Sequence, residues 1–123
     1  MEGQNPLYER RRHPRFPVDF PVDYHHEGGG KAFVGKAVNA SEGGLMVCLD
    51  ESISTGSELI VSMLFNLGYE FTGIKARCRV IWKDVGFVSD SPGYQYGLEF
   101  LDIGEHDIVK LKRLRKSATD HMV

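Results

Sequence analysis

The stretch FPVDFPVDY, residues 16–24, alternates apolar and polar side chains without a break. One face carries Phe16, Val18, Phe20, Val22 and Tyr24. Successive side chains of a strand point to opposite sides, so this period of two predicts a β-strand with one buried face. Proline donates no hydrogen bond to a sheet, and Pro17 and Pro21 therefore predict an irregular or unpaired stretch, with an edge at the start of the strand.

Further strand-like segments follow, separated by residues that favour turns. They lie at residues 32–38, 45–50, 58–67, 69–82 and 94–100. After residue 100 the period changes to about 3.6 residues, with Ile108, Leu111 and Leu114 in line, which predicts a short helix. Six strands and one terminal helix predict an all-β fold, a six-stranded antiparallel β-barrel with a C-terminal α-helix.

Local features of this barrel are predicted as well. Both faces of segment 58–67 carry apolar residues, which indicates burial on two sides. The apolar phase changes at Gly73, so we expect a β-bulge there. Residues 84–93 are expected to form a loop. Asp102 lies three residues ahead of Glu105, a spacing that favours a capping box at the start of the helix.

Length and composition favour one soluble domain. The chain has 123 residues, 41% of them hydrophobic and 26% charged, and its net charge of −2 argues against a domain devoted to holding long nucleic acid. We expect a flexible tail at residues 1–8, the domain at residues 9–117, including an arginine arm and the helix, and a second tail at residues 118–123.

Three observations predict a cytoplasmic protein. No apolar run is long enough to cross a bilayer, which argues against membrane insertion. Residues 1–15 lack the apolar segment of a signal peptide. Cys48 and Cys78 lie far apart inside strand patterns, so free thiols in a reducing compartment are expected rather than a disulfide.

Four arginines precede the first strand, namely Arg10, Arg11, Arg12 and Arg15. A guanidinium group is planar and permanently charged, and its fixed donors match a phosphate or the edge of a guanine. The alternative interpretation is a solvated basic tail. The second feature is NASEGG, residues 39–44, where Asn and Ser side chains can bond the local backbone and glycines tolerate a positive φ.

Motifs for catalysis are missing from the sequence. It contains no CxxC pair and no HExxH motif, and His25, His26 and Glu27 lie in a glycine-rich stretch typical of a solvated hairpin tip. Ser41 is not part of a GxSxG elbow. We therefore expect no catalytic residues, no metal site and no enzymatic activity.

The two polar motifs, read together, resemble those of a known family. Arg11 and Arg15 form RxxxR, and Asn39, Ser41 and Gly44 form NxSxxG, with one alternating strand and a hairpin between them. This order, together with the YGLEF ending at residues 96–100, resembles the PilZ domain, the bacterial receptor module for cyclic di-GMP. The resemblance covers roughly residues 9–116. It implies a six-stranded barrel with a C-terminal helix, no enzymatic activity and no cofactor besides the ligand.

The resemblance also implies roles for single residues. Arg11 and Arg15 would grip phosphates and guanine edges, and Asn39, Ser41 and Gly44 would line the barrel surface against a guanine. Asparagine replaces the commoner aspartate here, which exchanges a carboxylate acceptor for an amide that both donates and accepts.

Three more residues complete the predicted site. Gly43, like Gly44, keeps the turn free of side chains, so a planar base can approach the backbone. Trp82 either stacks on a base or belongs to the core, and the sequence leaves both readings open. An arginine at the position of Arg10 tends, in this family, to accompany an intercalated pair of ligand molecules, so we predict two ligands per site.

A mechanism follows from the position of the arginines. Residues 1–15 should be mobile without ligand, because like charges repel and nothing apolar holds them. With ligand bound, this arm should wrap over the barrel and present a new surface to an unidentified protein partner, in motility, adhesion or polysaccharide control.

Two other functions remain possible on the sequence alone. A small β-barrel that binds nucleic acid could place the arginines on phosphates and aromatic rings under bases. A degenerate PilZ-like barrel could serve only as a protein adaptor. The negative net charge argues against the first, and the presence of both motifs argues against the second.

Overall fold

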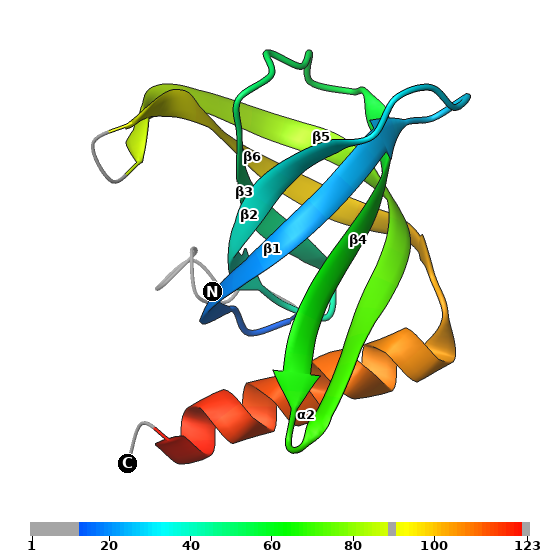
Figure 1. The fold of residues 1–123 in the computed structure, drawn as a ribbon, viewed down its shortest axis with the longest axis vertical. Helices are drawn as coiled ribbons and strands as arrows, with labels where there is room; N and C mark the ends of the chain where they lie inside the picture. Colours follow the sequence, from blue (N-terminus) through cyan, green and yellow to red (C-terminus); the bar gives the residue numbers. More distant parts are fainter. Residues whose placement is uncertain (1–12, 89–90, 122–123) are drawn as a thin grey trace, which may run out of the picture.

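The computed structural model describes residues 13–88 and 91–121. Within them, six antiparallel strands form a closed barrel that is followed by one helix (Figure 1). The elements are β1 (Phe16–His26), β2 (Phe33–Ala40), β3 (Gly44–Leu49), β4 (Glu58–Leu67), β5 (Glu70–Val88), β6 (Ser91–Ile103) and α2 (Glu105–His121). The strand order is β1-β2-β3-β6-β5-β4, and pairing of β1 with β4 closes the sheet. The predicted six-stranded antiparallel barrel with a C-terminal helix is confirmed.

Strand β1 is irregular where its prolines lie. It pairs with β2 from Phe16 to Tyr24, with a register shift between Pro17 and Phe20. Its pairing with β4 begins only at Val22. The first half of β1 therefore has one unpaired edge, as the two prolines predict. In the sequence, this half of β1 directly follows the four arginines.

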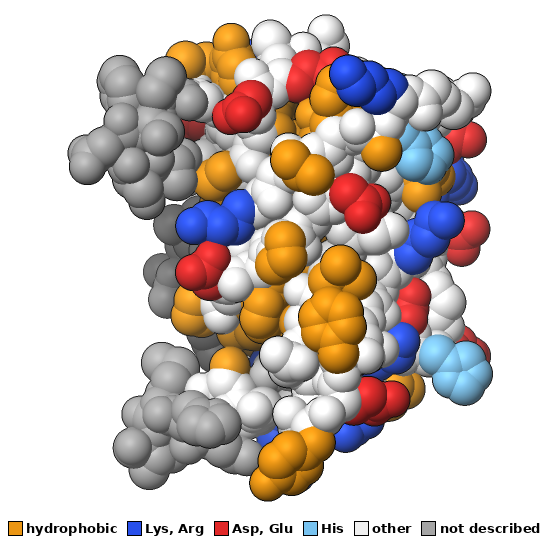
Figure 2. Space-filling view, in the orientation of Figure 1, with side chains coloured by type: hydrophobic (Ala, Val, Ile, Leu, Met, Phe, Trp, Pro, Cys, Tyr) orange, Lys and Arg blue, Asp and Glu red, His pale blue; other side chains and the backbone are white. Residues whose placement is uncertain are grey.

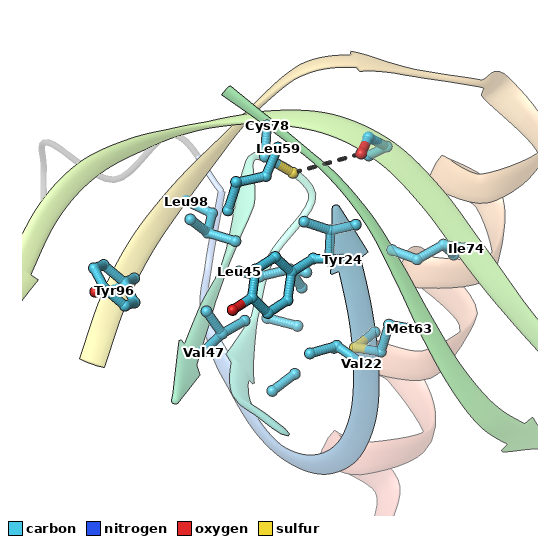
Figure 3. Packing of buried hydrophobic residues seen from close by; sticks show 14 of the residues in the cluster. Val22, Tyr24, Leu45, Val47, Leu59, Met63, Ile74, Cys78, Tyr96 and Leu98 are labelled. Carbon is cyan, nitrogen blue, oxygen red and sulfur yellow. Dashed lines mark hydrogen bonds between the residues drawn. The ribbon is translucent and has the colours of Figure 1, made fainter. Parts of the chain in front are cut away.

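Inward-facing side chains fill the barrel (Figure 3). Tyr24, Leu59, Met63, Cys78 and Val80 are each at most 1% exposed. Helix α2 lies across one end of the barrel (Figure 1) and contacts β1, β4 and β5. It turns Leu111 and Leu114 inward, with exposures of 0% and 7%, so the interior is a packed core rather than a channel.

Two predictions about β4 and β5 are wrong. Only one face of β4 is buried, because Leu64 on the other face is 39% exposed. The pairing of β4 with β5 runs through Gly73 without a shift, so no bulge lies there. Tyr69 and Phe71 are 109% and 67% exposed. Because these aromatic side chains point outward, the apolar pattern of the sequence changes phase at Gly73 although the strand itself is regular there.

The predicted loop at residues 84–93 is mostly strand. Strand β5 continues to Val88 and β6 begins at Ser91, and the two pair as a hairpin arm that projects from the barrel (Figure 1). Backbone pairing here overrides the turn-forming composition, because a hairpin needs only a short reversal.

The start of the helix differs from the prediction. It begins at Glu105, and the carbonyl of Gly104 accepts the N–H groups of Asp107 at 3.1 Å and Ile108 at 3.0 Å. Asp102 belongs to β6, so the proposed capping box is wrong. The helix continues to His121, so it includes residues 118–121 of the segment that we expected as a second tail. Among the described residues, no helix is long and apolar enough to cross a bilayer.

Candidate functional site

A cleft of about 220 Å³ lies on the outer surface of the barrel, beside the turn that joins β2 to β3. Six of the predicted site residues line it: Arg15, Asn39, Ser41, Gly43, Gly44 and Trp82. Arg10 and Arg11, the remaining two, lie outside the described residues. The cleft is completed by Leu45, Met46, Ile81, Gly97, Leu98 and Glu99. Segments that are far apart in the sequence thus meet in one place.

Ser41 builds the turn at one edge of the cleft. Its backbone N–H donates to the carbonyl of Gly44 at 2.9 Å, and its Oγ accepts the N–H of Gly43 at 3.1 Å. The carbonyl of Gly43 accepts the N–H of Phe100 on β6 at 2.9 Å. Ser41 is 8% exposed. These bonds fix the path of the turn, so the hydroxyl has a structural role within the motif.

The two glycines of the turn leave space for neighbouring groups, and neither adopts a positive φ. A Cβ added to Gly44 would overlap the carbonyl oxygen of Leu98, because β3 and β6 approach closely at this point. A Cβ added to Gly43 would come within 2.8 Å of the His13 ring. Gly44 therefore sets the distance between two strands, whereas Gly43 leaves room for a side chain of the segment before β1.

Trp82 lies in the cleft and not in the core. The indole covers Gly97 so closely that a Cβ there would overlap its Nε1. Trp82 is partly exposed and does not belong to the buried core cluster. The register shift of β5 against β6 between Val80 and Trp82 explains this, since it changes the face of the sheet on which the side chain emerges.

Sequence reasoning did not select Gly97 or Glu99. A glycine inside a strand is a signal for close approach of another group, and this signal was present at Gly97. Glu99 is two residues further along β6, on the same face. Its place in the cleft depends on the register with β3, where it pairs with Gly44, and only the structure supplies that register.

Charged and polar groups of the cleft retain free hydrogen-bonding capacity. Within residues 13–88 and 91–121, the side chains of Arg15, Asn39 and Glu99 make no hydrogen bond or ion pair. Arg15 and Glu99 are exposed, and Asn39 is partly exposed. The cleft therefore offers a cation, an amide, an indole face and a carboxylate to a ligand.

An ion pair ties the turn to helix α2. Arg115 Nη2 lies 3.0 Å from Glu42 Oε2, and the Glu42 side chain is only 14% exposed. The Nε atom of Arg115 is buried without a hydrogen-bond partner among the described residues. The edge of the cleft is thus anchored on the helix by a residue from inside the NxSxxG motif.

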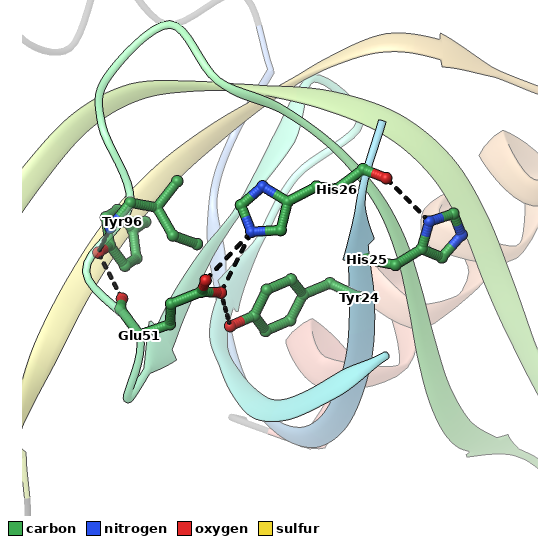
Figure 4. A network of polar contacts seen from close by, with 6 residues as sticks. Tyr24, His25, His26, Glu51 and Tyr96 are labelled. Atoms are coloured by element: carbon green, nitrogen blue, oxygen red, sulfur yellow. Dashed lines mark hydrogen bonds and ion pairs between the residues drawn. The ribbon is translucent and has the colours of Figure 1, made fainter. Parts of the chain in front are cut away.

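A second polar cluster lies elsewhere on the barrel (Figure 4). The Tyr24 hydroxyl donates to Glu51 Oε1 at 2.9 Å, and His26 Nε2 lies 3.2 Å from the same oxygen. Burial and the Glu51 carboxylate raise the pKa of Tyr24 above its usual value. No group of three or more His, Cys, Asp or Glu side chains in the described part of the chain could hold a metal ion.

Known proteins similar to this chain share its fold. The structure of Bacillus subtilis MotI/DgrA, an inhibitor of motility, matches with a TM-score of 0.73 and 20% identity over 89% of this chain and 52% of MotI. The PilZ domain of Escherichia coli YcgR, solved with c-di-GMP, has a TM-score of 0.72 and 12% identity, covering 92% of this chain and 94% of that domain. The K. pneumonia MrkH complex with c-di-GMP has a TM-score of 0.67 and 15% identity, over 92% and 54% of the two chains.

This chain spans about half the length of MotI and MrkH and nearly all of the YcgR domain. A search of curated proteins found no match. The family model for the PilZ domain matches residues 9–116, which is most of the 123 residues. The chain belongs to the PilZ domain family.

Proposed function

We propose that this chain is a receptor for cyclic di-GMP that binds the dinucleotide in the cleft and is not an enzyme. Arg10, Arg11 and Arg15 supply the cations. The other ligand contacts come from Asn39, Ser41, Gly43, Gly44 and Trp82. The single observation that carries this proposal is that Arg15, from the RxxxR motif, lines one cleft with residues of the NxSxxG motif, although Arg15 precedes β1 and residues 39–44 join β2 to β3.

The chemistry of the cleft matches the ligand. Cyclic di-GMP carries two phosphates, which accept charge-assisted hydrogen bonds from a guanidinium such as that of Arg15. Its guanines present the acceptors N7 and O6, which arginine also matches. The exposed part of the Trp82 indole is available for stacking on a base. Solved relatives support the proposal, because YcgR and MrkH were both determined with c-di-GMP.

The size of the cleft indicates that the described residues form part of the binding site. Sites that enclose a small ligand usually measure about 300–1,000 Å³, and this cleft measures about 220 Å³. The described part is smaller than such sites, so the whole dinucleotide needs further contacts. Arg10 and Arg11 would supply them from the chain before β1.

Signalling in this proposal depends on the division of the binding site between the cleft and the arginine arm before β1. Binding orders the arginine arm over the cleft and changes the surface that a downstream protein partner meets. Control of motility is one output of this kind, since MotI is an inhibitor of motility. Arg10 would allow two intercalated ligand molecules per site.

Calorimetric titration with cyclic di-GMP tests the proposal. Loss of one charge-assisted contact costs about 1.5–3 kcal/mol, so Arg15→Ala should weaken binding roughly tenfold to a hundredfold. Arg113→Ala, at an exposed position of α2 outside the cleft, is the matched control and should bind like the wild type. Unaltered affinity in both Arg11→Ala and Arg15→Ala would falsify the assignment.

Stoichiometry and ordering are measured in the same samples. The titration should give two ligands per chain, and Arg10→Leu should reduce this to one. Amide resonances of residues 9–15 should shift and sharpen into a single ordered set with ligand. Resonances that keep random-coil shifts at saturation would contradict the ordering of the arm.

Nucleic acid is the alternative ligand. Figure 2 shows basic and acidic side chains intermixed on one face of the molecule, without a stripe of one sign. A steep fall of RNA or single-stranded DNA affinity with salt, combined with no response to cyclic di-GMP, would favour this alternative.

A further inference from the structure

We propose that Glu99 selects guanine, by accepting hydrogen bonds from the N1–H and 2-amino groups of one base of the ligand. This inference rests on the proposed function and adds to it a residue outside both motifs. It follows from the position of Glu99 in the cleft, from its free carboxylate and from the charge of the ligand.

The neighbours of Glu99 on two sides are glycines. On β6, the outward-facing residue before it is Gly97, which is covered by the Trp82 indole. On β3, its cross-strand partner is Gly44. Neither neighbour has a side chain of its own, and the Glu99 carboxylate shares the cleft with the Trp82 indole, the surface on which a base could stack.

The Glu99 carboxylate has no partner within the described residues. Its cross-strand neighbour on β5 is Arg79, the residue that would be expected to neutralise it. Arg79 Nη2 instead lies 3.4 Å from Glu58 Oε2, and Arg77 Nη1 lies 3.0 Å from Glu58 Oε1. The cross-strand cation on β5 is thus engaged on β4, and Glu99 makes no hydrogen bond or ion pair within the described residues.

The charge of the ligand determines which part of it Glu99 can face. A carboxylate only accepts hydrogen bonds, and beside a phosphate it would meet a like charge. Among the described residues that line the cleft, Glu99 is the single carboxylate. It must therefore face a neutral donor of the ligand, and cyclic di-GMP carries such donors on its ribose 2′-hydroxyls, one at a time, and on its guanines, two side by side.

The guanine edge fits a carboxylate better than other bases do. Guanine presents N1–H and the 2-amino group side by side, so two carboxylate oxygens can each accept one bond. Adenine presents an acceptor at N1 next to its amino donor, which would leave one oxygen facing a lone pair. Asn39 offers one carbonyl oxygen and an amino group, so in this chain, which has asparagine at that position, the paired acceptors come from Glu99.

A cycle of one protein change and one ligand change tests this assignment. The probes are cyclic di-GMP and cyclic di-IMP, which keeps N1–H, O6 and N7 but lacks the 2-amino group. The wild-type chain should prefer cyclic di-GMP by about tenfold or more, the effect of one hydrogen bond to a charged group. In Glu99→Ala the preference should fall close to one.

The ratio of the affinities for cyclic di-GMP and cyclic di-IMP separates recognition of the 2-amino group from general charge effects. Removing a negative charge from the cleft should tighten binding of both ligands alike, because both carry the same phosphates. Asp84→Asn is the matched control, since it removes one exposed carboxylate of β5 outside the cleft and should leave the ratio at its wild-type value. Glu99→Gln, which keeps one acceptor oxygen, should give an intermediate ratio.

The assignment of Glu99 would be overturned if Glu99→Ala still binds cyclic di-GMP and prefers it over cyclic di-IMP as strongly as the wild type does. That outcome would leave the proposed function intact. Absence of binding by the wild-type chain would instead refute the proposed function, and this assignment with it. The exposed position of Glu99 on a paired strand lets both variants fold, which thermal melting verifies.

Discussion

The cleft beside the β2–β3 turn and the cluster around Glu51 are both polar, but they use their hydrogen bonds differently. Around Glu51, the side chains make hydrogen bonds with one another and with the backbone: Tyr24 and His26 meet its carboxylate, and the Tyr96 hydroxyl donates to its carbonyl at 2.7 Å while accepting the N–H of Ile53 at 2.8 Å (Figure 4). In the cleft, the described Arg15 and Glu99 side chains have no partner.

This difference separates a structural role from a binding role. A raised pKa at a polar cluster is often a signal of function, and here burial raises the pKa of both Tyr24 and Tyr96. Their hydroxyls, however, hold the loop after β3 against the barrel. Free hydrogen-bonding capacity identifies the cleft better than a shifted pKa does.

The largest expected effect on stability comes from a substitution at the edge of the cleft. Gly44→Ala places a Cβ against the backbone carbonyl of Leu98, which cannot move aside without separating β3 from β6. We expect a loss of about 3 kcal/mol or more in the free energy of unfolding, as for other overpacked sites. Chemical denaturation measures it.

Gly43→Ala is the matched control for that change. Its added Cβ would meet the ring of the exposed His13 at 2.8 Å, and this ring can rotate away. A loss below about 1 kcal/mol is expected for a surface change of this kind. Equal losses in the two variants would show that the close approach of β3 and β6 does not limit this position.

A smaller effect is expected in the cluster around Glu51. Tyr96→Phe leaves the N–H of Ile53 without its acceptor, and Ile53 is only 2% exposed. An unsatisfied buried donor costs about 1–3 kcal/mol. Affinity for cyclic di-GMP should not change, because Tyr96 lies outside the cleft. Tyr94→Phe, next to it on β6 and partly exposed, is the control for denaturation and calorimetry.

The smallest effect per group and per pH unit is a dependence of stability on alkaline pH. Burial raises the pKa of Cys78 to about 12, and burial with Glu51 raises the pKa of Tyr24. In the unfolded chain these groups lose their protons near pH 8.5 and 10, so above these values the folded state binds more protons. The free energy of unfolding should therefore fall, by at most about 1.4 kcal/mol per pH unit for each group.

Urea unfolding between pH 8 and 11 measures this slope. Tyr24→Phe should flatten it above pH 10, whereas Tyr69→Phe, at a fully exposed side chain, should leave it unchanged. The same slope in Tyr24→Phe and wild type would contradict a role for Tyr24 in the alkaline loss of stability.

The fold could be predicted because its pattern is local. Alternation in β1 and the repeated strand segments determined a barrel, and the spacing of Leu111 and Leu114 determined a helix against it. The errors occurred where apolar residues face solvent, as at Tyr69 and Phe71, and where backbone pairing extends through a polar segment, as in the β5–β6 arm.

The candidate site was predicted in part. Arg15, Asn39, Ser41, Gly43 and Gly44 follow from two short motifs, and the structure brings these five residues together. Gly97 and Glu99 belong to the YGLEF ending at residues 96–100, but neither of the two binding motifs includes them. They enter the cleft through pairing with strands that are distant in the sequence.

The sequence by itself determined the strands, the helix and the two motifs, because side-chain periodicity and motif spacing are properties of neighbouring residues. Only the tertiary structure decided that Trp82 lies over Gly97 rather than in the core. It alone decided that Glu99 stands free in the cleft, because Arg79 pairs with Glu58. The physical reason is that register shifts and competition for charged partners depend on contacts between strands, which no local pattern records.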